Sequence, residues 1–250
     1  MRLYCRHLAA LAAASFASAC ASDSSTAPGT LQTASLSQLL GEFAAPGLAA
    51  VSSVAGVPGV STAGLAASTC AFASASQSFV CPTVTASGLT LSQSYVLLSA
   101  AGAPLSAFDA STVAAIRTTG SATGTISDPS GPMTLDMRQT MTLSGLLTGT
   151  HTLNGTGTTH LVRSGSTTAG TIDVTNTFTN VVLPANGSTN SYPTSGTVIS
   201  TVASTIAGTT GSSTVTMTFN GTSKIPVTVS GLGATLRCTF DLASSTPTCS

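Results

Sequence analysis

The chain has 250 residues, and only 6% of them are charged, against about 25% in a typical soluble domain. Its seven basic and seven acidic residues balance, so no basic patch is expected, which argues against a nucleic-acid partner and against electrostatic binding to a membrane surface. No apolar run of about twenty residues follows residue 20, so the sequence predicts no transmembrane helix.

The first nineteen residues have the three-part pattern of a secretory signal. Arg2 and Arg6 give a basic start, and an apolar run extends from Leu8 to Phe16. Ala17-Ser18-Ala19 then supplies small side chains in front of Cys20. Because this apolar run is too short to span a bilayer, we interpret residues 1–19 as a signal peptide and the rest as an exported protein.

Ala17-Ser18-Ala19-Cys20 resembles the lipobox of bacterial lipoproteins, although Ala17 stands where leucine is commonest in that motif. The resemblance implies that Cys20 carries the lipid, with acyl chains such as palmitate, and that this lipid anchors the protein in the membrane. Ala21 follows the cysteine instead of aspartate, which resembles the sorting pattern of outer-membrane lipoproteins. The same residues also satisfy the A-x-A cleavage rule, so a secreted or periplasmic soluble protein is the alternative. The chain is thus similar to uncharacterised bacterial envelope lipoproteins, a resemblance that carries no functional site.

After Cys20 the chain divides into three parts. Residues 20–34 are small, polar and proline- or glycine-bearing, as in a flexible tether. Residues 35–65 are expected to hold a short amphipathic helix and a linker. Ser35 and Gln38 form a capping box, and Pro46-Gly47 ends the helix. Its apolar stripe, with i, i+3, i+4 and i+7 spacing, consists of Leu36, Leu39, Leu40 and Phe43. The stripe either packs on the following domain, or fills a cavity or binds a partner.

Residues 66–250 are expected to form a single antiparallel β-domain. Apolar residues alternate with Thr, Asp or Arg in several segments, which is typical of strands with one wet face. The apolar series are Met133, Leu135, Met137, Met141 and Leu143, then Ile172, Val174 and Phe178, then Val215, Met217 and Phe219, and finally Leu236, Cys238, Phe240 and Leu242. About a dozen strands without intervening helices predict an all-β fold, a large meander that forms a curved sheet, half-barrel, closed barrel or sandwich.

Three Asn-Gly pairs, Asn154-Gly155, Asn186-Gly187 and Asn220-Gly221, are turn signals. At the last pair a two-residue turn would send the flanking apolar rows to opposite faces. We therefore expect a three-residue loop, Asn220 to Thr222, that pairs Met217 with Ile225.

Cysteine spacing predicts a disulfide framework. Cys5 leaves with the signal and Cys20 is the lipid site, so Cys70, Cys81, Cys238 and Cys249 remain in an oxidising compartment. Both Cys70 to Cys81 and Cys238 to Cys249 span eleven positions. A hairpin about Ala75-Ser76 would set Cys70 against Cys81, and we expect the two local pairings among three connectivities.

No motif indicates an enzyme, a metal site or a cofactor. The acids Asp109, Asp128, Asp136, Asp173 and Asp241 are scattered singly. His151 and His160 could meet across a hairpin at Asn154-Gly155, where a surface pair is favoured over a ligand pair.

Two functional hypotheses remain. The first is a lipid-anchored, non-enzymatic envelope protein with a structural or interaction role, bound to a membrane or to an envelope protein partner. The second is a carrier of apolar ligands such as acyl chains or lipids. A helix followed by a long meander resembles the half-barrel of lipoprotein-carrier proteins, and that resemblance implies a concave face that holds acyl chains under the helix. The candidate apolar-ligand or helix-packing face consists of Leu36, Leu39, Leu40, Phe43, Met133, Met137 and Met141.

Overall fold

The computed structural model describes residues 69–86, 88–128, 131–164, 169–184, 192–206, 208–231, 233–244 and 246–249. The expected signal, tether and helical segment lie outside these residues. So do the lipidation site Cys20, the stripe residues Leu36, Leu39, Leu40 and Phe43, and the turn signal Asn186-Gly187.

Strands and short turns make up the described residues, in which no helix occurs. The strands are β1 (Ala71–Ala73), β2 (Ser78–Val80), β3 (Val84–Ala86), β4 (Leu89–Leu98), β5 (Pro104–Leu105), β6 (Ala115–Asp128), β7 (Gly131–Ser144), β8 (Thr152–Arg163), β9 (Gly170–Val182), β10 (Ser195–Ile206), β11 (Thr209–Thr218), β12 (Lys224–Gly231), β13 (Ala234–Asp241) and β14 (Thr246–Cys249). The fold is therefore all-β, as the alternating pattern predicted.

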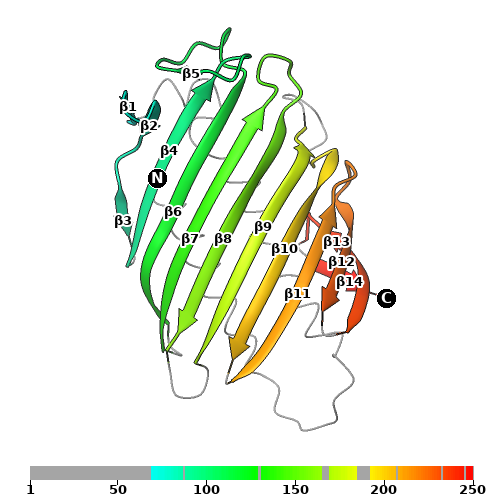
Figure 1. The fold of residues 1–250 in the computed structure, drawn as a ribbon. Coiled ribbons are helices and arrows are strands. Elements are labelled where there is room, and N and C mark those ends of the chain that lie inside the picture. The colour runs from blue at the N-terminus through cyan, green and yellow to red at the C-terminus, as the bar shows by residue number, and fades with distance from the viewer. Residues whose placement is uncertain are drawn as a thin grey trace.

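All fourteen described strands belong to one antiparallel sheet, shown face-on in Figure 1. From β6 to β14 every strand pairs with the next one along the chain, which is a meander. Strands β2, β3 and β5 share the other edge of β4. The main path begins at β1 and ends at β14, which do not pair, so the sheet is open. An open sheet is one of the expected architectures, and the described strands form neither the closed barrel nor the sandwich.

The expected alternation is confirmed in β7. Met133, Leu135, Met141 and Leu143 are buried and Met137 is partly buried, whereas Thr134 and Arg138 between them are exposed. The strand therefore places its methionines on one face and its hydroxyl and charged side chains on the other.

The turn expected at Asn154-Gly155 is wrong, because both residues lie inside β8. The pairing of β8 with β9 shifts between Leu153 and Gly155, and the side-chain Oδ1 of Asn154 accepts a 2.7 Å hydrogen bond from the backbone N–H of Asn180. Asn180 has a φ of 49°. The extra residue lies on β9, so the Asn-Gly pair of β8 stands opposite a β-bulge at Asn180 instead of forming a turn.

The register expected after β11 is also wrong, by two residues. Met217 pairs with Val227 instead of Ile225, and the connection runs from residue 219 to 223. Asn220 widens it, because its Oδ1 accepts the N–H of Thr222 at 3.1 Å and its Nδ2 donates to the carbonyl of Lys224 at 3.1 Å. A register shift of two residues leaves every side chain on the same face of the sheet, so the apolar side chains of β11 and β12 still lie on one face.

The buried side chains of the sheet fall into three clusters. One extends from Met141 and Phe178 to Ile225 and Phe240 near the last strands. A second contains Leu89, Ala122, Met133, Leu135 and Leu161, and a third gathers around Tyr95, Leu97, Val113 and Ile116. Close contacts between described strands are dominated by ladder neighbours, as expected for one continuous sheet.

Candidate functional site

The buried face contains the methionines that the sequence marked as a candidate apolar surface. Met133 and Met141 are 0% and 1% exposed, and Met137 lies on the same face with partial exposure. Adaptable thioether side chains suit either an ordinary core or a surface that accommodates varied apolar groups. The structure brings the three methionines to one face; their expected partners in residues 35–43 lie outside the described residues.

A row of polar and glycine residues crosses this buried face midway along the strands. Successive ladder pairs place side by side Gln93, Gly120, Gln139, Gly157, Asn176 and Ser200. Ser200 is 0% exposed, and its hydroxyl lies 2.6 Å from Oδ1 of Asn176, to which it donates. The row separates the Met133 and Leu161 cluster from the other two clusters, so the apolar face is two areas and not one continuous groove.

The charged side chain of Arg163 lies on the buried face. Arg163 ends β8, is 2% exposed, and pairs with Met133 on one side and Gly170 on the other. Its neighbour two positions earlier, Leu161, belongs to the second cluster. A guanidinium stays protonated in proteins, so a full positive charge sits at one end of an apolar area.

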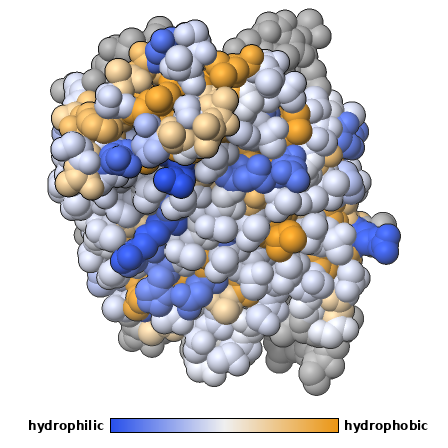
Figure 2. Space-filling model, turned by 45° about the horizontal axis from the view of Figure 1, so that its top comes forward, coloured by the Kyte–Doolittle hydropathy of each residue, from blue (hydrophilic) through white to orange (hydrophobic). Residues whose placement is uncertain are grey.

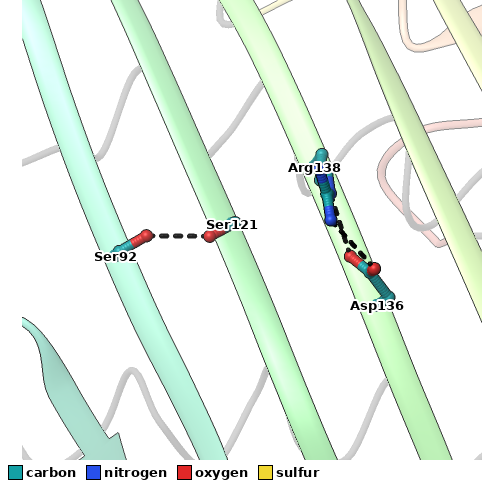
Figure 3. A network of polar contacts seen from close by, with 4 residues as sticks. All are labelled: Ser92, Ser121, Asp136 and Arg138. Carbon is teal, nitrogen blue, oxygen red and sulfur yellow. Dashed lines mark hydrogen bonds and ion pairs between the residues drawn. The ribbon is translucent and has the colours of Figure 1, made fainter.

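The opposite face of the sheet carries many serine and threonine hydroxyl groups. One row across the strands contains Ser92, Ser121, Thr158, Thr175, Thr201 and Thr214, with Arg138 among them. The next row contains Ser94, Thr119, Thr140, Thr156, Thr177 and Thr216, with the exposed Ile199 between the last two. The hydroxyls of Ser92 and Ser121 are 2.8 Å apart (Figure 3). Figure 2 shows a surface that is mostly pale, crossed by several strongly hydrophilic residues, with hydrophobic residues gathered mainly toward its top.

A cluster of four charged or titratable residues lies on this hydroxyl face. Asp136, His160 and Asp173 are directly opposed on β7, β8 and β9, and Nδ1 of His160 lies 2.6 Å from Oδ1 of Asp173. Arg138 binds both oxygens of Asp136, at 3.2 and 3.3 Å (Figure 3), and this hydrogen bond raises the pKa of Arg138 above its ordinary value. The four residues line a shallow hollow of about 200 Å³.

Sequence reasoning missed this cluster and misplaced one histidine. His151 and His160 do not meet across a hairpin, because no turn separates them: His160 lies in β8 and His151 directly precedes that strand. The partner of His160 is Asp173, thirteen residues on. A hairpin centred between residues 166 and 167 would have shown the pairing, but that region carries no Asn-Gly signal.

The geometry favours neither a metal centre nor a transmembrane helix in the described part of the chain. Within the described ranges no three His, Cys, Asp or Glu residues converge as metal ligands. Nor do those ranges contain a helix long and apolar enough to cross a bilayer. A second hollow, of about 430 Å³, opens beside Leu98, Ala114 and the exposed Leu147 at the ends of β4, β6 and β7.

Both expected disulfides are present. Cys70 bonds Cys81 and Cys238 bonds Cys249, each across a short hairpin. The first hairpin sets Phe72 against Phe79 with ring centroids 5.2 Å apart, as folding about Ala75-Ser76 predicted. Each bond joins a terminal strand of the open sheet to its neighbour, and disulfides of this kind indicate an oxidising compartment outside the cytoplasm.

The chain matches no family model, no curated protein and no solved structure.

Proposed function

We propose that this protein is an exported, lipid-anchored component of a bacterial cell envelope, and that its role is structural or interactive rather than enzymatic. The observation that carries the proposal is the hydroxyl face of the open sheet. Long neighbouring strands display serine and threonine rows with few charges. Hydroxyls both donate and accept hydrogen bonds, so such a face offers a broad polar contact surface.

Anchoring rests on the sequence before the sheet. The lipobox-like Ala17-Ser18-Ala19-Cys20 supplies the lipid site, and residues 21–34 supply a tether between the membrane and the domain. The two disulfides support export, because such bonds persist in oxidising compartments.

Membrane fractionation of the Cys20→Ala variant tests the anchor. The variant is expected in the soluble fraction, whereas the wild type is expected in the outer-membrane fraction. Cys5→Ala is the matched control, since Cys5 leaves with the signal peptide and its loss should change nothing. A Cys20→Ala protein that fractionates with the membrane would contradict lipid anchoring.

Photo-crosslinking in the native host tests the interaction role. A benzophenone amino acid at Thr175, in the middle of the hydroxyl face, is expected to give one discrete adduct with an envelope component. The same probe at Thr239, which lies in the terminal hairpin of β13 and β14, serves as control. Absence of any adduct from Thr175 and from its row neighbours Thr158 and Thr201 would contradict an interaction through this face.

A second candidate is a carrier of apolar ligands, favoured by the methionines of the buried face. It predicts that protein purified from the native host contains acyl lipid in stoichiometric amount, detectable by mass spectrometry of an organic extract. The structural role predicts none. Met133 and Met141 are at most 1% exposed, which favours the structural role. A ligand could reach these two side chains only if the atoms packed around them moved.

A further inference from the structure

Small apolar residues gather at the end of the sheet where the chain passes from β4 into β6 and from β7 into β8. Residues 99–114, which include β5, join β4 to β6, and residues 145–151 join β7 to β8. Both connections lie at the top of Figure 1, and Figure 2 shows hydrophobic residues mainly toward its top. Five alanines and one proline of residues 99–114 are exposed, so this end of the sheet presents an apolar surface to water.

Leu147 is the largest exposed apolar side chain of these two connections. Five large apolar side chains among the described residues are at least 36% exposed; four of them lie within strands, and Leu147, at 44%, lies in a connection. It lines the hollow of about 430 Å³ together with Leu98, Ala100 and Ala114, and every residue that lines this hollow is uncharged. An exposed apolar patch beside an uncharged hollow is typical of a site that contacts another molecule.

Charge in these two connections is sparse. Within residues 99–114 and 145–151, all of them described, Asp109 is the one residue with a full charge, and His151 is the other titratable residue. The hydroxyl and the backbone N–H of Ser111 both donate to Oδ1 of Asp109, so this carboxylate has hydrogen-bond donors within its own loop. The composition therefore favours a partner that is itself apolar, such as the acyl chains of a lipid, over a charged partner.

The chain that leads from the expected lipid site joins the sheet next to this end. Cys70 follows the first described residue, and it packs against the third buried cluster. Leu105 and Phe108, from the connection between β4 and β6, pack against the same cluster. Residues 21–68 lead from Cys20 to this point, so a lipid on Cys20 is connected to the domain beside its apolar end.

We propose that this apolar end, residues 99–114 and 145–149, docks on the surface of a lipid bilayer, with Leu147 inserted among the acyl chains. The inference rests on the lipid anchor of the proposed function and gives the anchored domain an orientation. The strands then rise from the membrane, and the hydroxyl face stays open to an envelope partner. Apolar contact strengthens membrane binding beyond the anchor, in proportion to the area removed from water.

Tryptophan fluorescence tests the docking, because the chain contains no tryptophan of its own. Leu147→Trp places a reporter at the apolar end, and Ser164→Trp places a matched one just after β8, at the opposite end of the sheet. Each lipidated protein is reconstituted into phosphatidylcholine vesicles whose acyl chains carry bromine, which quenches tryptophan on contact. Quenching and a blue shift of the emission are expected for Leu147→Trp and not for Ser164→Trp.

Equal quenching of the two reporters, or quenching of neither, would overturn the proposal. A blue-shifted emission of Leu147→Trp in the absence of vesicles would overturn it as well, because this end would then be covered by protein, for example by a second copy of the chain.

A vesicle-flotation assay separates docking from anchoring. It uses the Cys20→Ala protein, which carries no lipid, with phosphatidylcholine vesicles in excess. Leu147→Ser in this background is expected to lower the affinity for vesicles about tenfold, because the transfer of one leucine side chain out of water is lost. Val84→Ser is the matched control and should keep the affinity, since Val84 is 43% exposed but lies on β3.

Equal affinities of the Leu147→Ser and Val84→Ser proteins would contradict docking, whatever the state of Cys20. A wild-type protein without lipid on Cys20, combined with the expected tenfold difference, would instead contradict the anchor and leave the docking surface supported.

Discussion

At Gly155 the close approach of two strands leaves no room for a side chain. A Cβ atom there would lie 2.4 Å from the carbonyl oxygen of Thr140 and 2.6 Å from the sulfur of Met141. Backbone atoms cannot move away cheaply, so Gly155→Ala is expected to destabilise the fold by about 1–3 kcal/mol. Gly211→Ala is the control, since a Cβ at Gly211 meets only Ser204 Oγ, at 3.8 Å, and should change stability by less than about 0.5 kcal/mol. Chemical denaturation of both variants checks this, and equal midpoints would contradict it.

Asp109 gives a prediction about pH. The hydroxyl of Ser111 donates to its Oδ1 at 2.7 Å, the backbone N–H of Ser111 donates at 2.8 Å, and these bonds lower the pKa of Asp109 below 3.8. A lowered pKa in the folded state means that the stabilisation is present above the unfolded pKa and is lost as pH falls through the folded one. Ser111→Ala should raise the pKa toward 3.8, as read from the carboxyl resonance in an NMR titration. An unchanged pKa would mean that the hydroxyl does not contribute.

Local residue patterns predicted the disulfides and the faces of the strands, but they missed the pairing of His160 with Asp173. Alternation fixes on which face a side chain lies, since its period is two. It does not fix which residue of the next strand stands opposite, because that depends on loop length. The connection after β11 shows the same limit: Asn220 bonds Thr222 and Lys224 within it, and Met217 pairs with Val227 instead of Ile225.

At the scale of elements, one disulfide hairpin lies at each end of the open sheet. The first joins the strands of β1 and β2, and the second joins β13 and β14. Terminal strands have unpaired backbone groups and fray or recruit other chains, so a covalent link to the neighbour protects them. Closure of a loop of this length contributes about 2–3 kcal/mol in the chain-entropy model.

We expect the Cys238→Ser, Cys249→Ser double variant to lose about 2–3 kcal/mol of stability and to aggregate more readily at its exposed edge. The Cys70→Ser, Cys81→Ser variant should lose a similar amount with less aggregation, because β3 and β5 still cover part of the edge of β4. Urea denaturation and light scattering measure the two effects. Unaltered stability in both variants would contradict a stabilising role for the two disulfides.

At the scale of the whole molecule, the meander was predictable and the openness of its sheet was not. Strand count and hairpin signals specify a sheet in which neighbours in sequence are neighbours in space. Whether the ends close depends on strand tilt and stagger, which the residue pattern does not encode. Here β1 and β14 do not pair, so the sheet stays open. One of its faces is apolar and buried, and the other carries hydroxyl side chains.

Oxidation of methionine by dilute hydrogen peroxide tests most directly whether one face of this open sheet is covered. Four methionines remain beyond Cys20, and Met133, Met141 and Met217 are at most 1% exposed whereas Met137 is partly exposed. In the folded protein, mass spectrometry should show Met137 oxidised first and the other three protected, with all four reacting alike in urea. Equal oxidation of Met133 and Met137 in the folded protein would contradict a covered apolar face.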